Sequence, residues 1–199
     1  CKKYLDQLHQ FKLGQLTDAN KTDYHLVENQ LMNTEWNINE QRAFEWDPSG
    51  YNVSGGFAEM LANDYEPLEK RLDNFYKKMA NVQAYYAAAK RNIKNPTREH
   101  TALAIEQNMG GISVFTTDLD EALSKSTLDA ATKQKIKERA AGAVAAIKEY
   151  ADWLKNLKND APRNFRLGKE LYAKKFAFEI QSGYTPDQIY AKAVKHKDE

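Results

Sequence analysis

Histidine is the side chain that most often binds metal ions or transfers protons near neutral pH, and this chain of 199 residues contains His9, His25, His100 and His196. A zincin-type site needs two histidines one helical turn apart with a glutamate beside the first. Both imidazoles then hold one zinc ion, and the carboxylate activates its bound water. No histidine here lies four residues from another or is followed by glutamate. We therefore expect no catalytic residue, no metal ligand and no bound cofactor in this segment.

Two weaker pairs, Asp6 with His9 and His25 with Glu28, lie one helical turn apart. A carboxylate-metal site in a helix bundle needs Glu-x-x-His motifs on two helices and further carboxylates that face inward. Neither pair has that order, so we interpret both as ordinary solvated side chains. A helical iron or manganese enzyme stays as a third hypothesis, which stoichiometric bound metal would support.

Residues for nucleophilic or nucleotide chemistry also lack their motifs. Cys1 stands at a terminus, and no serine lies in a Gly-x-Ser-x-Gly turn. Gly55-Gly56 and Gly110-Gly111 lack the Lys-Ser/Thr of a phosphate loop and the three-glycine dinucleotide fingerprint. We interpret the first pair as a turn before a helix. The second pair lies inside a helical pattern, where each glycine costs about 1 kcal/mol relative to alanine, and indicates either close helix packing or a kink beside a cleft.

Charge and composition exclude several classes of protein. The formal net charge is +1, from 29 basic and 28 acidic residues spread along the chain, whereas nucleic-acid binders concentrate basic charge. The hydrophobic fraction of 42% is ordinary for a globular protein. No apolar run approaches the ~20 residues that a membrane span needs. We expect no nucleic-acid partner and no membrane-spanning segment.

Cys1 is the single cysteine, which rules out an internal disulfide and a zinc site built from cysteines. Its position fits two interpretations, the acylated first residue of a mature lipoprotein or the start of a fragment. Tyr4, Leu5 and Leu8 already lie at helical spacing, where a lipoprotein usually has a polar tether. This pattern favours the fragment.

The elements that would position any site are helices nearly throughout, because apolar residues recur at spacings of three and four. We predict an all-α fold, a bundle of about eight to nine mostly antiparallel helices with no sheet. The expected helices cover 2–13, 19–43, 57–63, a segment opened by Pro67, a segment capped by Asn81, a long segment from Asn95-Pro96-Thr97 to Leu123, the longest helix from Thr127 or Asp129 to about 159, then 167–181, and a last helix after Thr185.

The clearest interruption of the helical pattern lies at residues 45–56, where Pro48 and several glycines occur. We predict an ordered loop there, held by Trp46 and Tyr51. Residues 1–199 are treated as a single helical domain of a larger protein, with a subdivision near this loop as the alternative.

Two further patterns concern the second half of the sequence. Thr185-Pro186-Asp187-Gln188 has an N-cap, a first-turn proline and a capping-box glutamine in order, and Gly183 is a suitable end for the helix before it. Five aromatic residues either line a pocket for peptide side chains or pack in the core. Their helical spacing favours the core, and they are Tyr85, Tyr86, Trp153, Tyr172 and Phe176.

Several stretches, in their order and spacing, together resemble one bacterial family, catalogued as domain of unknown function 885. They are residues 44–52 (FEWDPSGYN), 65–72 (YEPLEKRL), 99–101 (EHT), 106–111 (EQNMGG), 164–172 (NFRLGKELY) and 185–187 (TPD). The resemblance covers nearly the whole chain.

This resemblance implies a longer, often exported and mostly helical protein similar to zincin metallopeptidases. The family's His-Glu-x-x-Pro-Gly-His-type zinc motif lies in the C-terminal half, beyond this chain, so zinc would belong to the full-length parent. The chain would then be the non-catalytic helical N-terminal portion, with the C-terminal half of the same protein as its partner. A periplasmic or lipid-anchored location is implied as well.

If the parent is a peptidase, this portion would form one wall of a cleft that binds a peptide substrate. Arg71, Arg166 and Tyr172 are the candidates for contacting that substrate, since arginine pairs with carboxylates through two bonds and a tyrosine hydroxyl donates to a carbonyl or oxyanion. Helix capping and interdomain ion pairs are the alternative for these residues. For the whole chain, the alternative is a self-sufficient helical interaction or scaffold module of the cell envelope.

Overall fold

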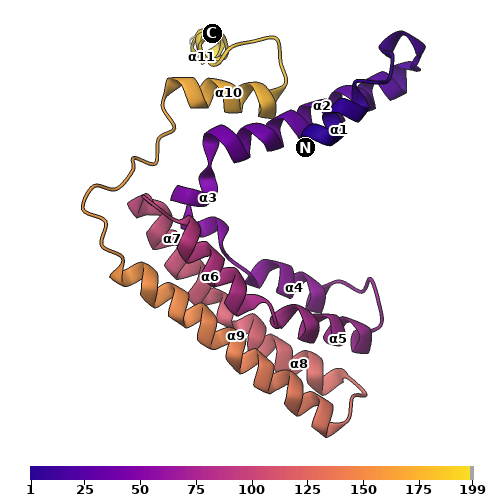
Figure 1. Cartoon of the computed structure of the whole chain (residues 1–199), viewed down its shortest axis with the longest axis vertical. Helices are drawn as coiled ribbons and strands as arrows, with labels where there is room; N and C mark the ends of the chain where they lie inside the picture. The colour runs from indigo at the N-terminus through magenta and orange to yellow at the C-terminus, as the bar shows by residue number, and fades with distance from the viewer. Residues whose placement is uncertain (198–199) are drawn as a thin grey trace. The chain divides into compact units, whose positions relative to one another are not determined.

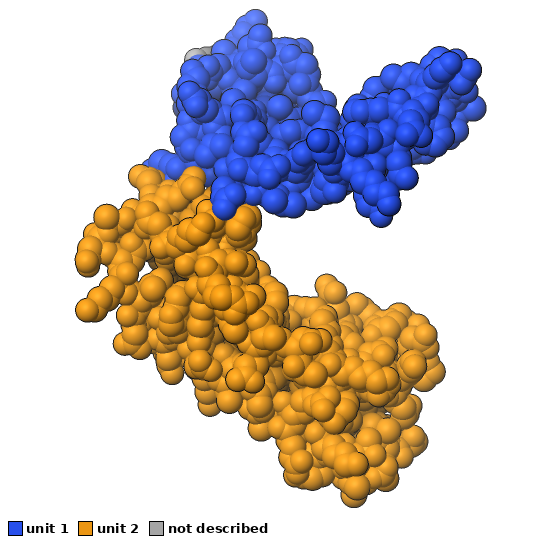
Figure 2. Space-filling model, viewed as in Figure 1, with its two compact units in different colours: residues 1–43, 166–199 blue, residues 44–165 orange. Residues whose placement is uncertain are grey.

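The fold is all-α, as the sequence predicts. A computed structural model describes residues 1–197, and no strand occurs within them. Figure 1 shows the order of the helices. The chain divides into two compact units, which Figure 2 distinguishes by colour. Unit 2 is the continuous stretch 44–165, and unit 1 combines residues 1–43 with residues 166–199.

Unit 2 is organised around its longest helix. This helix, α9, packs against α5, α6 and α7, and Figure 1 shows the shorter helices running alongside it. Asp129 caps its N-terminus by accepting a hydrogen bond from the Thr132 N–H. The helices of this unit, with α3 at the boundary, are α3 (Ala43–Trp46), α4 (Ser54–Ala62), α5 (Leu68–Met79), α6 (Val82–Asn92), α7 (Arg98–Gly110), α8 (Thr117–Lys125) and α9 (Ala130–Asn156).

The core of unit 2 is continuous and tightly packed. The rings of Phe57 and Phe75 meet edge to face with centroids 4.7 Å apart, and Phe115 meets Phe57 at 4.8 Å. On α9, Ala140 and Ala143 are buried, and such small side chains let a neighbouring helix approach closely. Unit 2 therefore buries most of its large apolar residues within its own helices.

The predicted ordered loop at 45–56 is confirmed only between α3 and α4, where residues 47–53 include a short 3-10 turn (Pro48–Gly50), whereas residues 54–56 already belong to α4. Trp46 and Tyr51 are both buried. The Tyr51 hydroxyl donates to the carbonyl of Phe44 at 2.8 Å, and the Tyr150 hydroxyl of α9 donates to the carbonyl of Pro48 at 3.2 Å. These bonds satisfy loop carbonyls that would otherwise be buried without partners.

Unit 1 consists of α1 (Lys2–Leu8), α2 (Asp18–Trp36), α10 (Lys169–Ile180) and α11 (Pro186–Lys197). α10 packs against α2 through a small set of contacts. The Asn29 amide donates to the carbonyl of Phe178 at 3.0 Å, the rings of Trp36 and Phe178 lie 5.7 Å apart, and Lys174 forms an ion pair with Glu40. One short interface thus connects the two halves of this unit.

Little of unit 1 is buried. Its buried apolar residues are Leu5, Tyr24 and Trp36, and no residue of α10 or α11 is buried. Within the expected helix 19–43, Val27 of α2 is 47% exposed and Ile38 of the π-helical turn that follows α2 is 51% exposed. Other exposed large apolar residues of this unit are Tyr4, Phe11, Leu13, Leu26, Met32, Tyr172, Ile180, Tyr184, Ile189, Tyr190 and Val194.

The prediction of one helix running from residues 95–97 to Leu123 is wrong. α7 begins after Thr97, whose hydroxyl accepts from the His100 N–H, and ends at Gly110. A 3-10 turn (Gly111–Phe115) and then α8 follow. A Cβ at Gly111 would lie 2.5 Å from the Cβ of Ser54, whereas Gly110 has no neighbour within 4 Å. Glycine at 111 therefore permits a close approach to α4, as the packing interpretation requires.

Other predicted helix ends also need correction. The expected helix 2–13 ends at Leu8, and the expected helix 19–43 is α-helical only to Trp36, followed by a π-helical turn (Asn37–Gln41). α10 ends at Ile180 instead of Gly183, because Gln181 adopts the left-handed conformation (φ 49°) and donates its N–H to the carbonyl of Ala177. Local backbone bonds of this kind leave no periodic signal in the sequence.

Gly55-Gly56 does not form a turn ahead of its helix. Both residues lie in the first turn of α4, which begins at Ser54. Asn52 provides the reason, since its side-chain oxygen accepts from the Ser54 N–H at 3.0 Å and from the Ser54 hydroxyl at 2.7 Å. This capping bond starts the helix before the glycines.

Candidate functional site

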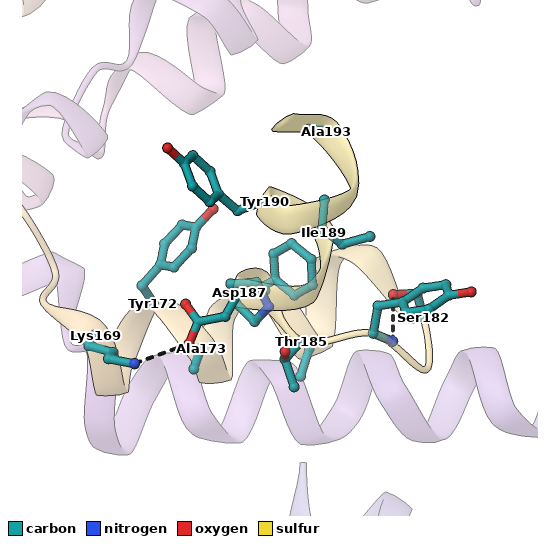
Figure 3. A pocket seen from close by; sticks show the side chains of 13 residues that line it. Lys169, Tyr172, Ala173, Ser182, Thr185, Asp187, Ile189, Tyr190 and Ala193 are labelled. Carbon is teal, nitrogen blue, oxygen red and sulfur yellow. Dashed lines mark hydrogen bonds and ion pairs between the residues drawn. The ribbon is translucent and has the colours of Figure 1, made fainter. Parts of the chain in front are cut away.

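A hollow with a volume of about 760 Å³ lies between α10 and α11. Figure 3 shows its lining from close by. The lining is mostly apolar and aromatic. It includes Tyr172 and Phe176 from α10, and Pro186, Ile189, Tyr190 and Ala193 from α11. A volume in the range of roughly 300–1,000 Å³ with few polar groups is typical of a binding site.

The start of α11 is fixed by its sequence. The Thr185 hydroxyl accepts from the Gln188 N–H at 3.2 Å, and the Gln188 side chain accepts from the Thr185 N–H at 2.8 Å. This reciprocal pair is the predicted capping box. It sets the residue at which α11 begins, and therefore which residues of α11 face α10.

One ion pair lies at the rim of the hollow. Lys169 Nζ in the first turn of α10 lies 3.1 Å from Asp187 Oδ2 in the first turn of α11, as Figure 3 shows. Both side chains are largely exposed, so the pair adds little stability. The two charges neutralise each other. A ligand in the hollow would therefore meet mainly apolar surface and hydroxyl groups, and little net charge.

Tyr172 is the predicted candidate that lines this hollow. Its exposure is 51%, and its ring centroid lies 6.2 Å from that of Phe176, one turn further along α10. Tyr190 of α11 lies on the same side of the hollow in Figure 3 and is 73% exposed. These side chains can pack against apolar groups and offer hydroxyl hydrogen bonds.

Arg71, the second candidate, lies in unit 2 and is only 5% exposed. Its guanidinium donates to the carbonyls of Met60 (3.2 Å) and Leu61 (2.7 Å) near the end of α4, to the Glu66 carbonyl (3.0 Å), and to Asp64 (2.8 Å). Arginine thus caps the end of α4 and fixes the connection to α5. It also borders a hollow of about 430 Å³ between α4, α5 and α8.

Arg166, the third candidate, lies in the irregular segment before α10, within unit 1, and is exposed. Unit 1 thus contains Arg166 and Tyr172, whereas Arg71 belongs to the other unit. The residues of α11 that line the hollow were not among the sequence candidates. Their helical spacing was visible in the sequence, but nothing there shows that they face α10.

His9 and His25, the histidines of the two weak pairs, both contact the carboxylate of Glu28. Glu28 Oε1 lies 2.8 Å from His9 Nε2, and Glu28 Oε2 lies 3.6 Å from His25 Nδ1. This contact joins the end of α1 to α2 and becomes an ion pair when a histidine is protonated. No group of three or more histidine, cysteine or carboxylate side chains suited to a metal ion occurs in residues 1–197.

The five aromatic residues considered for a pocket do not share one environment, and Tyr85 lies at the surface of unit 2 with 39% exposure. Tyr86 is buried and stacks on Tyr150 at 4.6 Å, and Trp153 packs on the same core, so core packing is right for these residues. Burial raises the pKa of the Tyr86 hydroxyl, which donates to the Asn108 side chain. Core packing is wrong for Tyr172 and Phe176, because both line the open hollow.

Comparisons with known proteins identify related chains of unknown function. The profile of a family described as bacterial protein of unknown function (DUF885) matches residues 1–199. A solved structure, described as "a putative lipoprotein of unknown function from Shewanella oneidensis", is 45% identical over 99% of this chain, with a TM-score of 0.92. No curated protein matches.

The compared chains differ in length. The present chain spans 37% of the length of the Shewanella oneidensis chain. Within the described residues, every helix is too short or too polar to cross a membrane.

Proposed function

We propose that this chain is the non-catalytic helical N-terminal portion of a longer zinc-dependent peptidase-like protein. The chain belongs to the DUF885 family of bacterial proteins of unknown function. In this proposal unit 2 is a scaffold, and unit 1 is a surface that the remainder of the protein covers in part. The reaction class is proposed because the resemblance to this family implies a similarity to zincin metallopeptidases. The 37% coverage of a closely similar chain supports the greater length.

The observation that carries this proposal is the exposure of apolar side chains in unit 1. α10 and α11 bury no residue, although they contain several tyrosines and isoleucines. Large contiguous apolar surfaces on soluble proteins usually mark binding sites. Such a surface is expected on a portion that functions against further protein or against a substrate.

In the proposed cleft wall, Tyr172 and Arg166 are the residues of unit 1 that would contact a peptide. Tyr172 offers a ring and a hydroxyl at the edge of the hollow, and a guanidinium pairs well with a peptide carboxylate. Arg71 would act at a distance from substrate, since its hydrogen bonds to the Leu61 carbonyl and to Asp64 fix local structure within unit 2.

A second candidate function is a helical interaction module of the cell envelope. The continuous core of unit 2 favours it, since such a core can fold without further protein. The description of the related Shewanella oneidensis chain as a lipoprotein points to an extracytoplasmic, lipid-anchored place. In this chain the exposed Cys1 thiol would carry the lipid.

The first test is to determine the gene sequence beyond the codon for Glu199. Continuation into a His-Glu-x-x-Pro-Gly-His-type stretch, together with chelator-sensitive cleavage of peptides by the full protein, would support the peptidase-like function. A stop codon soon after Glu199 would contradict it and favour the interaction module. Fractionation of the producing cells, with mass spectrometry of the N-terminus, would test lipid attachment at Cys1.

The substrate-contact role has a separate test in the full-length protein. Arg166→Ala should reduce peptide turnover while leaving the melting temperature unchanged, and Tyr172→Phe should do the same to a smaller extent. Lys158→Ala, which also removes an exposed basic side chain but lies in unit 2, is the matched control and should leave turnover unchanged. A lower melting temperature with normal turnover would instead assign Arg166 a purely structural role.

A further inference from the structure

We infer that the hollow between α10 and α11 is a socket for an apolar helix from the C-terminal remainder of the longer chain. This inference rests on the proposed function, which supplies that remainder. It adds the place at which the two portions meet and the chemistry of the segment that fills it.

α10 has two faces that can pack, and one of them is covered. Lys174 and Phe178 lie one turn apart, and they contact Glu40 of the π-helical turn and Trp36 of α2, respectively. Tyr172 and Phe176 also lie one turn apart, about half a turn of helix away from the first pair, and line the hollow. A helix that packs on one neighbour normally has a polar opposite face. The aromatic second face of α10 therefore indicates a second packing partner.

α11 provides the other side of the socket but does not close it. Ile189, Tyr190 and Ala193 lie at helical spacing and line the hollow, as Figure 3 shows. Tyr190 is nevertheless 73% exposed and Ile189 is 37% exposed. Two helices with an apolar concave surface between them are the arrangement that accepts a third helix in a groove.

The chemistry of the socket favours an apolar segment. Its charged rim residues, Lys169 and Asp187, already form a pair. A third helix that buried Tyr172, Ile189 and Tyr190 would remove several apolar side chains from water, at about 25 cal/mol for each Å² of apolar surface. A strongly charged partner would find no free countercharge in this pair.

The length of the related chain supports a segment of the same protein as the occupant. A chain that is 45% identical and superposes with a TM-score of 0.92 extends well beyond this segment, since this segment covers 37% of it. The remainder would be present at high effective concentration, because it is covalently attached. A separate partner or a second copy would have to compete with it.

Cysteine labelling tests the socket directly. Cys1 is the single cysteine of these 199 residues, so Cys1→Ser removes their only thiol, and any cysteine in the continuation of the longer chain is also replaced by serine. Tyr190→Cys places a thiol in the socket, and Tyr65→Cys, in unit 2 and 54% exposed, is the matched control. The rate of maleimide labelling is compared between residues 1–199 and the same chain continued by the rest of its gene. We expect labelling at position 190 to slow at least tenfold in the longer chain, with position 65 unchanged.

Three outcomes would overturn the inference. Equal labelling at position 190 in both chains would show that the remainder does not cover the socket. Labelling of the longer chain that slows only after casein-derived peptides are added would make the hollow a substrate subsite. Slower labelling of residues 1–199 at higher protein concentration would identify a second copy as the occupant.

Chelator-sensitive peptide cleavage is measured on the longer chain in parallel. Protection of position 190 without such cleavage would support the socket and contradict the peptidase-like function. Cleavage without protection would have the opposite meaning.

Discussion

The two units of this protein differ in how completely they bury their apolar residues. In unit 2, Leu72, Phe75 and Tyr150 are completely buried within one continuous core. In unit 1, α10 and α11 bury nothing, and Tyr190 has 73% of its surface exposed. Both units have helices with similar caps and apolar patterns, so the difference lies in the available packing partners. Unit 2 resembles a scaffold that is complete, and unit 1 resembles a surface that needs a further partner.

The largest expected effect would come from the core of unit 2. Phe75→Ala removes a ring that contacts both Phe57 and Phe115 and should lower the free energy of unfolding by about 3–5 kcal/mol. The matched change in unit 1, Phe11→Ala at a side chain with 61% exposure, should cost less than about 0.5 kcal/mol. Urea denaturation followed by circular dichroism would measure both. Equal losses would end the distinction between the units.

A smaller effect is expected where α7 meets α4. Gly111→Ala would force a methyl group against the Ser54 side chain and should cost about 1–3 kcal/mol, as overpacking usually does. Gly110→Ala has no neighbour within 4 Å and should stabilise the protein by up to about 1 kcal/mol, because alanine favours the helix. Thermal melts of both variants give the comparison. A neutral Gly111→Ala variant would indicate that the packing there yields easily.

In unit 1, a substitution that likewise affects only local structure is one that removes the capping box at the start of α11. Thr185→Ala removes the hydroxyl that accepts from the Gln188 N–H and should weaken α11 by about 1 kcal/mol. Hydrogen exchange should become faster in the amides of α11 and stay unchanged in those of α9. Faster exchange throughout unit 2 would mean that the two units unfold together.

The smallest effect concerns the start of α9. Hydrogen bonds from the Thr132 side chain and then its backbone lower the pKa of Asp129. A carboxylate whose pKa is lowered by folding stabilises the folded state above its unfolded pKa, near 4, and this contribution is lost as pH falls through the lower folded value. The stability difference between wild type and Asp129→Asn should therefore shrink between pH 5 and pH 2. If thermal melts showed the same stability difference between the two proteins from pH 5 to pH 2, the charge of Asp129 would have no role in stability.

The sequence predicts the helices well and their partners poorly. The capping box at Thr185 and the loop held by Trp46 and Tyr51 are local patterns, and both are confirmed. Tyr24, Val27 and Leu31 recur at helical spacing and predict an apolar face on α2, but only the structure shows that Tyr24 is buried while Val27 remains half exposed. Periodicity identifies a face, whereas burial depends on residues far away in the chain.

The same distinction between local patterns and distant contacts applies to the candidate site. Tyr172 was identifiable from its residue type and from the family resemblance, and the structure places it in the hollow. The capping role of Arg71 depends on carbonyls of residues 60, 61 and 66. A guanidinium that bonds to backbone groups leaves no signature in the identity of those residues, so this role could not be predicted.

The discontinuity of unit 1 has a consequence for synthesis on the ribosome. The helices α1 and α2 emerge first, but their packing partner α10 follows only after the roughly 120 residues of unit 2. At translation rates of about 5–20 residues per second, α2 would wait roughly 6–24 s for α10. During this interval unit 2 can fold, while the apolar face of α2 stays uncovered. During synthesis, the uncovered face of α2 is therefore a surface to which chaperones can bind.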